Sequence, residues 1–137
     1  SLLNSDDDAY IAARAIQFFT PGIPQIYYVG LLAGENDMEN VKKTGEGREI
    51  NRHNFSIEEV DMALQKPVVQ RLLELIRFRN EYGAFNGEFK ISNTSDKVVR
   101  LSWQKDNKLC LLSVDLETNK TLISYTNDKG ELAHYNV

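Results

Sequence analysis

Apolar residues recur with two different periods along the chain, and the change of period divides it near residue 85. Before Gly83 the apolar positions follow helical spacing, most clearly in residues 7–19 and 67–82. After Gly87 they alternate with polar residues in short runs separated by turn-forming Asn, Asp and Gly. The pattern predicts helices followed by a small antiparallel β-domain, a meander of β-sandwich type. Its five expected strands are residues 88–92, 98–104, 108–115, 121–126 and 131–137.

A short apolar run follows the first helical segment. Ser5 or Asp6 is suited to cap that helix, and Pro21-Gly22 ends it. Residues 23–29, IPQIYYV, are apolar and rich in β-formers, which is typical of a strand buried on both faces. Helix, strand, long loop and a second helix form the βα unit of a (β/α)₈ barrel, in which the chemistry lies on the loops that follow the strands.

The loop after this run carries the candidate functional residues. It extends over about twenty residues, holds Arg48, Arg52 and His53, and has helical potential over residues 37–43. A loop of this length in a compact domain is usually functional. Glu35, Asp37 and Glu39 alternate within it and are expected to form a solvated rim; calcium ligation is a weak alternative, because their spacing matches no known loop.

Two further helices are expected after the loop. Ser56 and Glu59 form a capping box, which predicts a short helix ending near Leu64. Pro67 then occupies a first-turn position of a longer helix. We therefore expect residues 1–84 to be the end of a (β/α)₈ barrel (its penultimate helix, eighth strand, long loop and final helix) and residues 85–137 to be a C-terminal β-domain.

Length and composition limit the classes of protein. The chain has 137 residues, whereas a whole barrel takes about 250, and it begins with Ser1, so we expect a piece of a longer protein. A net charge of −4 without a basic stripe argues against nucleic acid. No apolar run reaches the roughly 20 residues that cross a bilayer. Cys110 is the single cysteine and an expected core residue, which excludes an internal disulfide and favours the cytoplasm.

Several motifs carry a family resemblance. The segment PGIPQIYYVG resembles the eighth-strand signature of the α-amylase family of retaining glycoside hydrolases and transglycosylases. The run LLAGENDME, the segment GREINRH and the helix start KPVV follow in order, and together they resemble the sucrose phosphorylase group. The resemblance is close over roughly residues 5–90. The remaining residues resemble the family's C-terminal β-domain only in being a domain of that type.

The resemblance implies a reaction for the complete protein. Sucrose and phosphate would give α-glucose 1-phosphate and fructose by a retaining double displacement, with phosphate as a substrate and with no cofactor or metal. The catalytic carboxylates of the family lie upstream, so this chain is expected to hold no catalytic residue and to need the N-terminal remainder of the barrel.

The resemblance also implies one substrate-binding residue. Arg48 corresponds to an arginine that pairs with an upstream aspartate and closes the glucosyl subsite, a role that suits the rigid fork of a guanidinium. Arg52 and His53 are weaker candidates for the same site and more readily brace the loop.

The sequence is compatible with two other kinds of function. Within the same group of enzymes, the donor is sucrose 6-phosphate or glucosylglycerate in place of sucrose. In a different class, the chain is a non-catalytic structural or carbohydrate-binding β-module, for which Trp103 is a candidate stacking residue, although a core position is the expectation for it.

Overall fold

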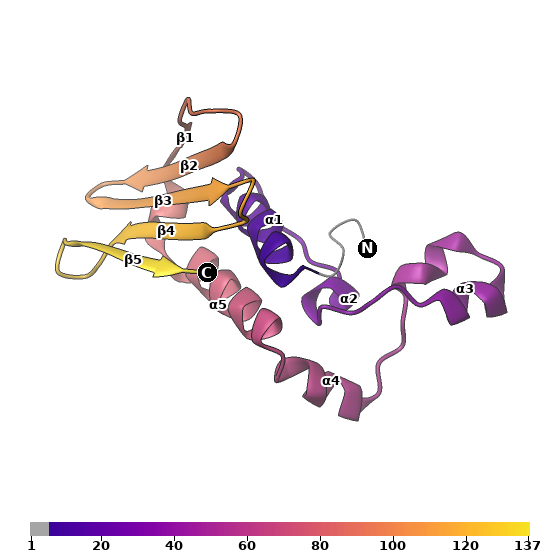
Figure 1. Cartoon of the computed structure of the whole chain (residues 1–137). Coiled ribbons are helices and arrows are strands. Elements are labelled where there is room, and N and C mark those ends of the chain that lie inside the picture. Colours follow the sequence, from indigo (N-terminus) through magenta and orange to yellow (C-terminus); the bar gives the residue numbers. More distant parts are fainter. Residues whose placement is uncertain (1–5) are drawn as a thin grey trace.

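The structure is a computed structural model that describes residues 6–137, and it combines a helical half with one β-sheet (Figure 1). The helices, including two short 3₁₀ turns, come first and the strands follow. In chain order the elements are α1 (Asp7–Phe19), α2 (Tyr28–Leu31), α3 (Met38–Thr44), η1 (Gly47–Asn51), α4 (Ile57–Leu64), α5 (Pro67–Glu81), η2 (Gly83–Asn86), β1 (Glu88–Ile91), β2 (Val98–Lys105), β3 (Lys108–Asp115), β4 (Thr121–Thr126) and β5 (Leu132–Asn136).

Local signals set the ends of the helices. Asp6 caps α1 by accepting hydrogen bonds from the backbone N–H groups of Asp8 and Ala9; Ser5, the other candidate cap, lies outside the described residues. The capping box of Ser56 with Glu59 opens α4, and Pro67 begins α5, both as the sequence predicts.

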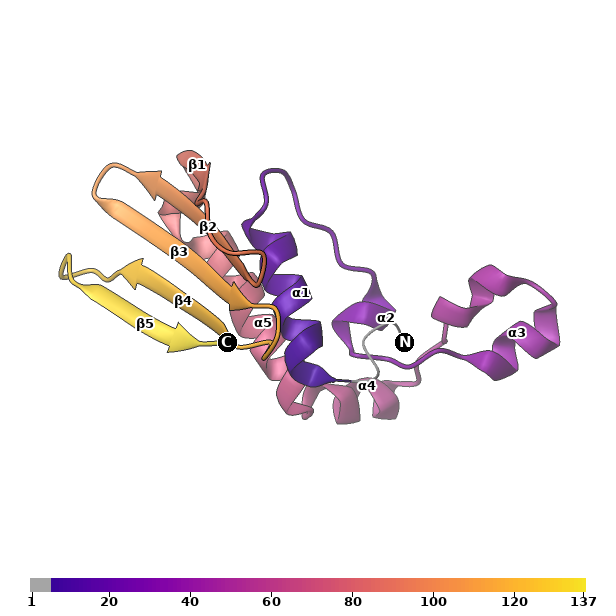
Figure 2. The same ribbon diagram turned by 45° about the horizontal axis from the view of Figure 1, so that its top comes forward.

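The sheet is an antiparallel meander in the order β1-β2-β3-β4-β5. The five expected strands are confirmed, with boundaries that differ from the prediction by at most one residue. The β-sandwich expectation is wrong, because helices take the place of a second sheet. Figure 2 shows α1 lying against one face of the sheet with α5 beside it.

One hydrophobic core joins α1, α5 and η2 to the sheet, because each of them turns an apolar face towards it. Cys110 and Trp103 are both buried in this core, as expected. The core residues of α1, α5, η2, the strands and the C-terminal residue are Ile11, Ala12, Ala15, Phe18, Phe19, Val68, Val69, Leu72, Leu75, Ala84, Phe85, Leu101, Trp103, Cys110, Leu112, Val114, Ile123 and Val137.

Residues 6–137 do not by themselves form the expected strand over residues 23–29. Residues 23–27 form no regular element, and α2 begins at Tyr28. The backbone of Tyr27 is extended (φ −75°, ψ 145°), but a strand also needs a neighbouring strand to bond with, and the sheet of residues 6–137 lies elsewhere. As a consequence the Ile23 side chain is 92% exposed.

The C-terminal end of α1 is held by side chains from α5 and from the sheet. The indole N–H of Trp103 donates to the Phe19 carbonyl oxygen (2.7 Å), and Nε of Arg79 donates to the Phe18 carbonyl oxygen (2.7 Å). The last carbonyls of a helix have no partner within it, so these two bonds satisfy groups that are otherwise unpaired.

No helix within residues 6–137 has the length and apolar character needed to cross a membrane.

We predict that Trp103→Phe destabilises the complete protein by about 1–3 kcal/mol, because the buried Phe19 carbonyl loses its donor and the smaller phenyl ring fills less of the core. Tyr135→Phe is the control, since the buried Tyr135 hydroxyl has no hydrogen-bond partner among the described residues. Urea unfolding of both variants measures the difference. Equal losses of stability in the two variants would contradict the role assigned to the indole N–H.

Candidate functional site

The candidate site is built on the long segment between α2 and α4, residues 32–56. It contains α3 and η1, which extend away from the sheet and the helices that cover it (Figure 1). Asp37 begins α3 as its N-cap, and Gly45 ends it in the left-handed conformation (φ 73°) that glycine favours. We call residues 38–51, which comprise α3 and η1, the α3–η1 lobe. Neither α3 nor η1 contains a fully buried residue.

Arg48 and Arg52 are both bound by acidic residues of the lobe. Nε of Arg48 lies 2.6 Å from Oε2 of Glu46 and 3.7 Å from Oε1 of Glu49. Nη1 of Arg52 lies 3.2 Å from the same Glu49 oxygen. The Arg48 side chain is 67% exposed, so these contacts orient the guanidinium without burying it. Exposed ion pairs of this kind add little stability, and the Arg48 side chain therefore stays accessible to a ligand.

His53 lies between two carboxylates. Its Nδ1 is 2.8 Å from Oδ2 of Asp37, and its Nε2 is 3.1 Å from Oε1 of Glu59. Both bonds raise the pKa of His53 above its ordinary value, with Asp37 the larger cause. In return the His53 hydrogen bond is the main cause that lowers the pKa of Asp37. The pKa of Glu59 is lowered first by the backbone N–H of Ser56 and then by His53.

An aromatic contact connects His53 to the start of the loop. The ring of Phe55 meets the His53 ring edge to face at 4.7 Å and the Tyr28 ring at 6.1 Å. Gly34 packs closely against Val29 and Phe55. A Cβ at this position would be 2.9 Å from Cγ1 of Val29 and 3.0 Å from the Phe55 ring. The absence of a side chain at Gly34 thus permits the close approach of the α2 turn to Phe55.

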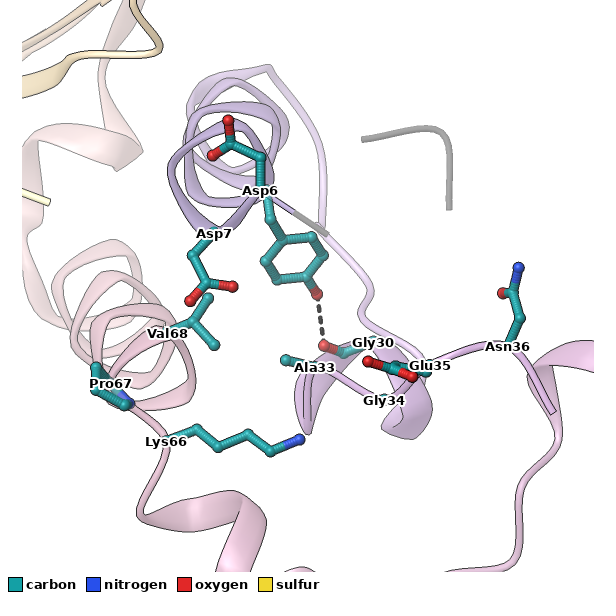
Figure 3. A pocket seen from close by; sticks show the side chains of 11 residues that line it. Asp6, Asp7, Gly30, Ala33, Gly34, Glu35, Asn36, Lys66, Pro67 and Val68 are labelled. Atoms are coloured by element: carbon teal, nitrogen blue, oxygen red, sulfur yellow. Dashed lines mark hydrogen bonds between the residues drawn. The ribbon is translucent and has the colours of Figure 1, made fainter. Parts of the chain in front are cut away.

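Two adjoining pockets flank this region. The first, of about 510 Å³, lies between the N-terminus of α1, the turn after α2 and the start of α5. Figure 3 shows Lys66 extending across it towards the chain at Ala33 and Gly34. The second, of about 470 Å³, is lined by His53 and Phe55 and shares Lys66 and Glu35 with the first. Both pockets have mixed polar and apolar linings that include charged side chains of both signs.

The structure brings together some of the expected site residues. Arg48 and Arg52 share the Glu49 carboxylate, whereas His53 binds Asp37 and Glu59 and lines the second pocket. Arg48 lines neither pocket. No group of three or more potential metal ligands is found within residues 6–137, so the weak calcium alternative gains no support; Asp37 acts there as a helix cap and as a partner of His53.

Some residues of this region were not singled out as site residues from the sequence. The capping box marks Glu59 as a helix-start residue, but its second contact, with His53, depends on the folded loop. Asp37 carries the signal of an N-cap, since it precedes a helical run. Lys66, which lines both pockets, belongs to the KPVV motif, but that motif marks a helix start and not a pocket residue.

Known proteins similar to this chain form one group. A sucrose 6(F)-phosphate phosphorylase of Thermoanaerobacterium thermosaccharolyticum is 66% identical over 135 residues, which are 98% of this chain and 28% of that protein. A glucosylglycerol phosphorylase of Marinobacter adhaerens is 53% identical over 96% of this chain and 28% of its own length. A sucrose phosphorylase of Agrobacterium vitis is 51% identical over 89% of this chain and 25% of its own length. No family model matches the chain.

The fold agrees with a solved structure of the same group. The crystal structure of sucrose 6F-phosphate phosphorylase from Thermoanaerobacter thermosaccharolyticum superposes with a TM-score of 0.97 at 66% identity, over 98% of this chain and 27% of the other. The resemblance read from the sequence motifs is thereby confirmed. The chain spans about a quarter of the length of the relatives that it matches.

We predict that Gly34→Ala loosens the start of the loop, because the added methyl group overlaps Val29 and Phe55, a kind of overpacking that costs about 1–3 kcal/mol. Hydrogen exchange of residues 28–36 in the complete protein should accelerate. Gly47→Ala is the matched control, since nothing lies within 4 Å of a Cβ at that position. Unchanged exchange in Gly34→Ala would show that the turn tolerates a side chain.

Proposed function

Because this chain is a C-terminal fragment of the sucrose phosphorylase group, we propose that the complete protein is a glycosyltransferase that moves a glucosyl group from sucrose to phosphate. The products are α-glucose 1-phosphate and fructose. A carboxylate displaces fructose from the anomeric carbon, an acid protonates the departing oxygen, and phosphate then displaces the carboxylate. Two inversions keep the α configuration.

In this proposal the present chain supplies substrate binding and structure, and the remainder of the protein supplies the catalytic carboxylates. Arg48 is the residue assigned to the glucosyl subsite. Its exposed guanidinium has one nitrogen bound to Glu46 and further N–H groups that can form a fork to a carboxylate or to neighbouring sugar hydroxyls. Arg52 shares the Glu49 carboxylate with Arg48, which favours an orienting role over direct contact with the sugar.

The observation that carries the proposal about the remainder of the barrel is the exposed segment 23–27. Its apolar sequence is that of a buried strand, yet Ile23 is almost fully exposed and Tyr27 is half exposed. We infer that this segment becomes the eighth strand of a (β/α)₈ barrel when neighbouring strands from the rest of the protein bond to both of its edges. The active site would then lie beyond its C-terminal end, where the loop begins.

A second donor is favoured by a specific observation. The 66% identity to a sucrose 6(F)-phosphate phosphorylase exceeds the 51% identity to a sucrose phosphorylase, which favours a phosphorylated fructosyl unit. By the same measure glucosylglycerol is a further alternative donor, since the identity to a glucosylglycerol phosphorylase is 53%; glucosylglycerate is the other alternative within the group. The independent β-module loses support, because the similarity covers the helical half as well as the sheet. A cytoplasmic location remains part of the proposal and rests on the lone buried Cys110.

We predict that the complete protein releases α-glucose 1-phosphate from sucrose or sucrose 6F-phosphate only when phosphate is present. Arg48→Ala should lower kcat/KM by about 10²-fold or more, through lost positioning of the glucosyl unit. Arg100→Ala, which removes an exposed arginine of β2, is the matched control.

The outcomes of this assay separate the alternatives. Free glucose without glucose 1-phosphate would indicate a hydrolase and overturn the proposed reaction. Preference for sucrose 6F-phosphate or for glucosylglycerate would replace sucrose as the donor. Full activity of Arg48→Ala would show that Arg48 does not contribute to substrate binding.

We also predict that residues 1–137 expressed alone aggregate or fold incompletely, because residues 23–27 then expose apolar surface and two strand edges. Light scattering and hydrogen exchange measure this, with the complete protein as the control. Slow, cooperative exchange of residues 23–27 in the isolated chain would contradict the inference that their strand partners lie elsewhere.

A further inference from the structure

The two ring nitrogens of His53 both face carboxylate oxygens, at 2.8 Å (Asp37) and 3.1 Å (Glu59). A neutral imidazole has one N–H and one lone pair, so it can donate to one of these carboxylates while its lone pair faces the other. An imidazolium donates from both nitrogens and satisfies both contacts. The geometry therefore selects the charged form of His53.

Each of the two carboxylates is also bound to the first turn of a helix. The second oxygen of Asp37 accepts from the backbone N–H of Asn40 (2.8 Å) at the start of α3. The second oxygen of Glu59 accepts from the backbone N–H of Ser56 (2.7 Å) in the capping box of α4. His53 therefore connects the capped ends of two helices through a single ring.

The Asp37 side of this connection leads to Arg48. The backbone N–H of Asp37 donates to the Ile50 carbonyl oxygen (2.8 Å), so the cap of α3 and the turn η1 are fixed to each other. Glu49 of the same turn contacts Arg48 and Arg52. A displacement of Asp37 relative to α4 would consequently carry both arginines with it.

We propose that His53 is a positioning residue that, as an imidazolium, joins the α3–η1 lobe to α4 and thereby sets the place of Arg48. The connection between lobe and helix stands on the geometry alone, whereas its effect on catalysis rests on the proposed function of Arg48. The lobe lacks buried residues, so hydrogen bonds and charge at its base take the place of packing.

The charged groups around His53 set the direction of its pH dependence. Asp37 and Glu59 bind His53 directly, and the pocket that His53 lines also contains Glu35, Glu39 and Lys66. The pKa of His53 lies above its ordinary value of 6.5, so the connection is fully present below pH 6.5 and is lost as the pH rises through the raised pKa.

The two carboxylates set the acid limit of the connection. The pKa values of Asp37 and Glu59 lie below their ordinary values of 3.8 and 4.5. Their contribution is therefore present above those ordinary values and is lost as the pH falls through the lowered pKa values. The connection thus holds between these acidic limits and the raised pKa of His53, and it is released as the pH rises through that pKa.

The first test is hydrogen exchange of the complete protein at pH 6 and pH 8.5, corrected for the intrinsic rate. We expect residues 35–52 of the wild type to exchange about three- to tenfold faster at pH 8.5. His53→Gln should exchange at the faster rate at both pH values. His134→Gln, which alters a histidine bound to Ser124 on the sheet, should behave as the wild type.

A second variant guards against misfolding of His53→Gln. Glu59→Gln keeps an acceptor for the capping box but removes one of the two charges that face His53, so the pH at which residues 35–52 loosen should fall. Protection that is independent of pH in the wild type, or an unchanged midpoint in Glu59→Gln, would overturn the proposal.

Kinetics separate this proposal from the proposed function. If the complete protein is a phosphorylase, KM for the sugar donor should rise several-fold from pH 6 to pH 8.5 in the wild type, and this rise should be absent in His53→Gln. A protein without phosphorylase activity would overturn the proposed function, while the exchange data would still decide the role of His53. Identical pH profiles of KM in an active wild type and His53→Gln would reject the link between His53 and the substrate site.

Discussion

The end of α1 is the point on which the rest of the structure depends. Carbonyl groups there lack helical partners, and the N–H groups that satisfy them come from Trp103 in β2 and Arg79 in α5. The Arg79 guanidinium also lies 4.3 Å from the centre of the Phe85 ring. Helix, second helix and sheet thus meet at one place, from which the chain leaves towards residues 23–27. The direction in which the candidate loop begins is therefore fixed by the core.

Elements whose signals are local could be predicted from the sequence. The turn residues between strands, the capping box at Ser56 and the first-turn Pro67 each act within a few residues, and the structure has the elements that they indicate. Residues 23–29 could not be assigned in the same way, because a strand requires a partner at a distance. Their apolar pattern indicates burial, and the exposed Ile23 shows that residues 6–137 do not provide it.

The residues of the candidate site also differ in whether their roles follow from local sequence or depend on distant partners. The segment GREINRH identifies Arg48 by its resemblance to a family, without reference to the fold. The contacts of His53 join residues sixteen positions before it and six positions after it, and no spacing rule connects these three residues. Glu59 shows the limit most clearly: one of its two roles, in the capping box, follows from sequence, whereas its bond to His53 requires the folded loop.

The two halves of the chain are stabilised by different physical terms, and this difference bears on function. The helices on the sheet are held by buried apolar side chains, which carry no titrating charge, so their contribution depends little on pH. The α3–η1 lobe has no such core, and hydrogen bonds and ion pairs fix its position. Interactions of that kind change with protonation and screening. Under the proposed function, in which Arg48 contacts the glucosyl unit, this second kind of attachment would suit a loop that binds a sugar and then releases the product, since each bond contributes modestly and can break without disturbing the core.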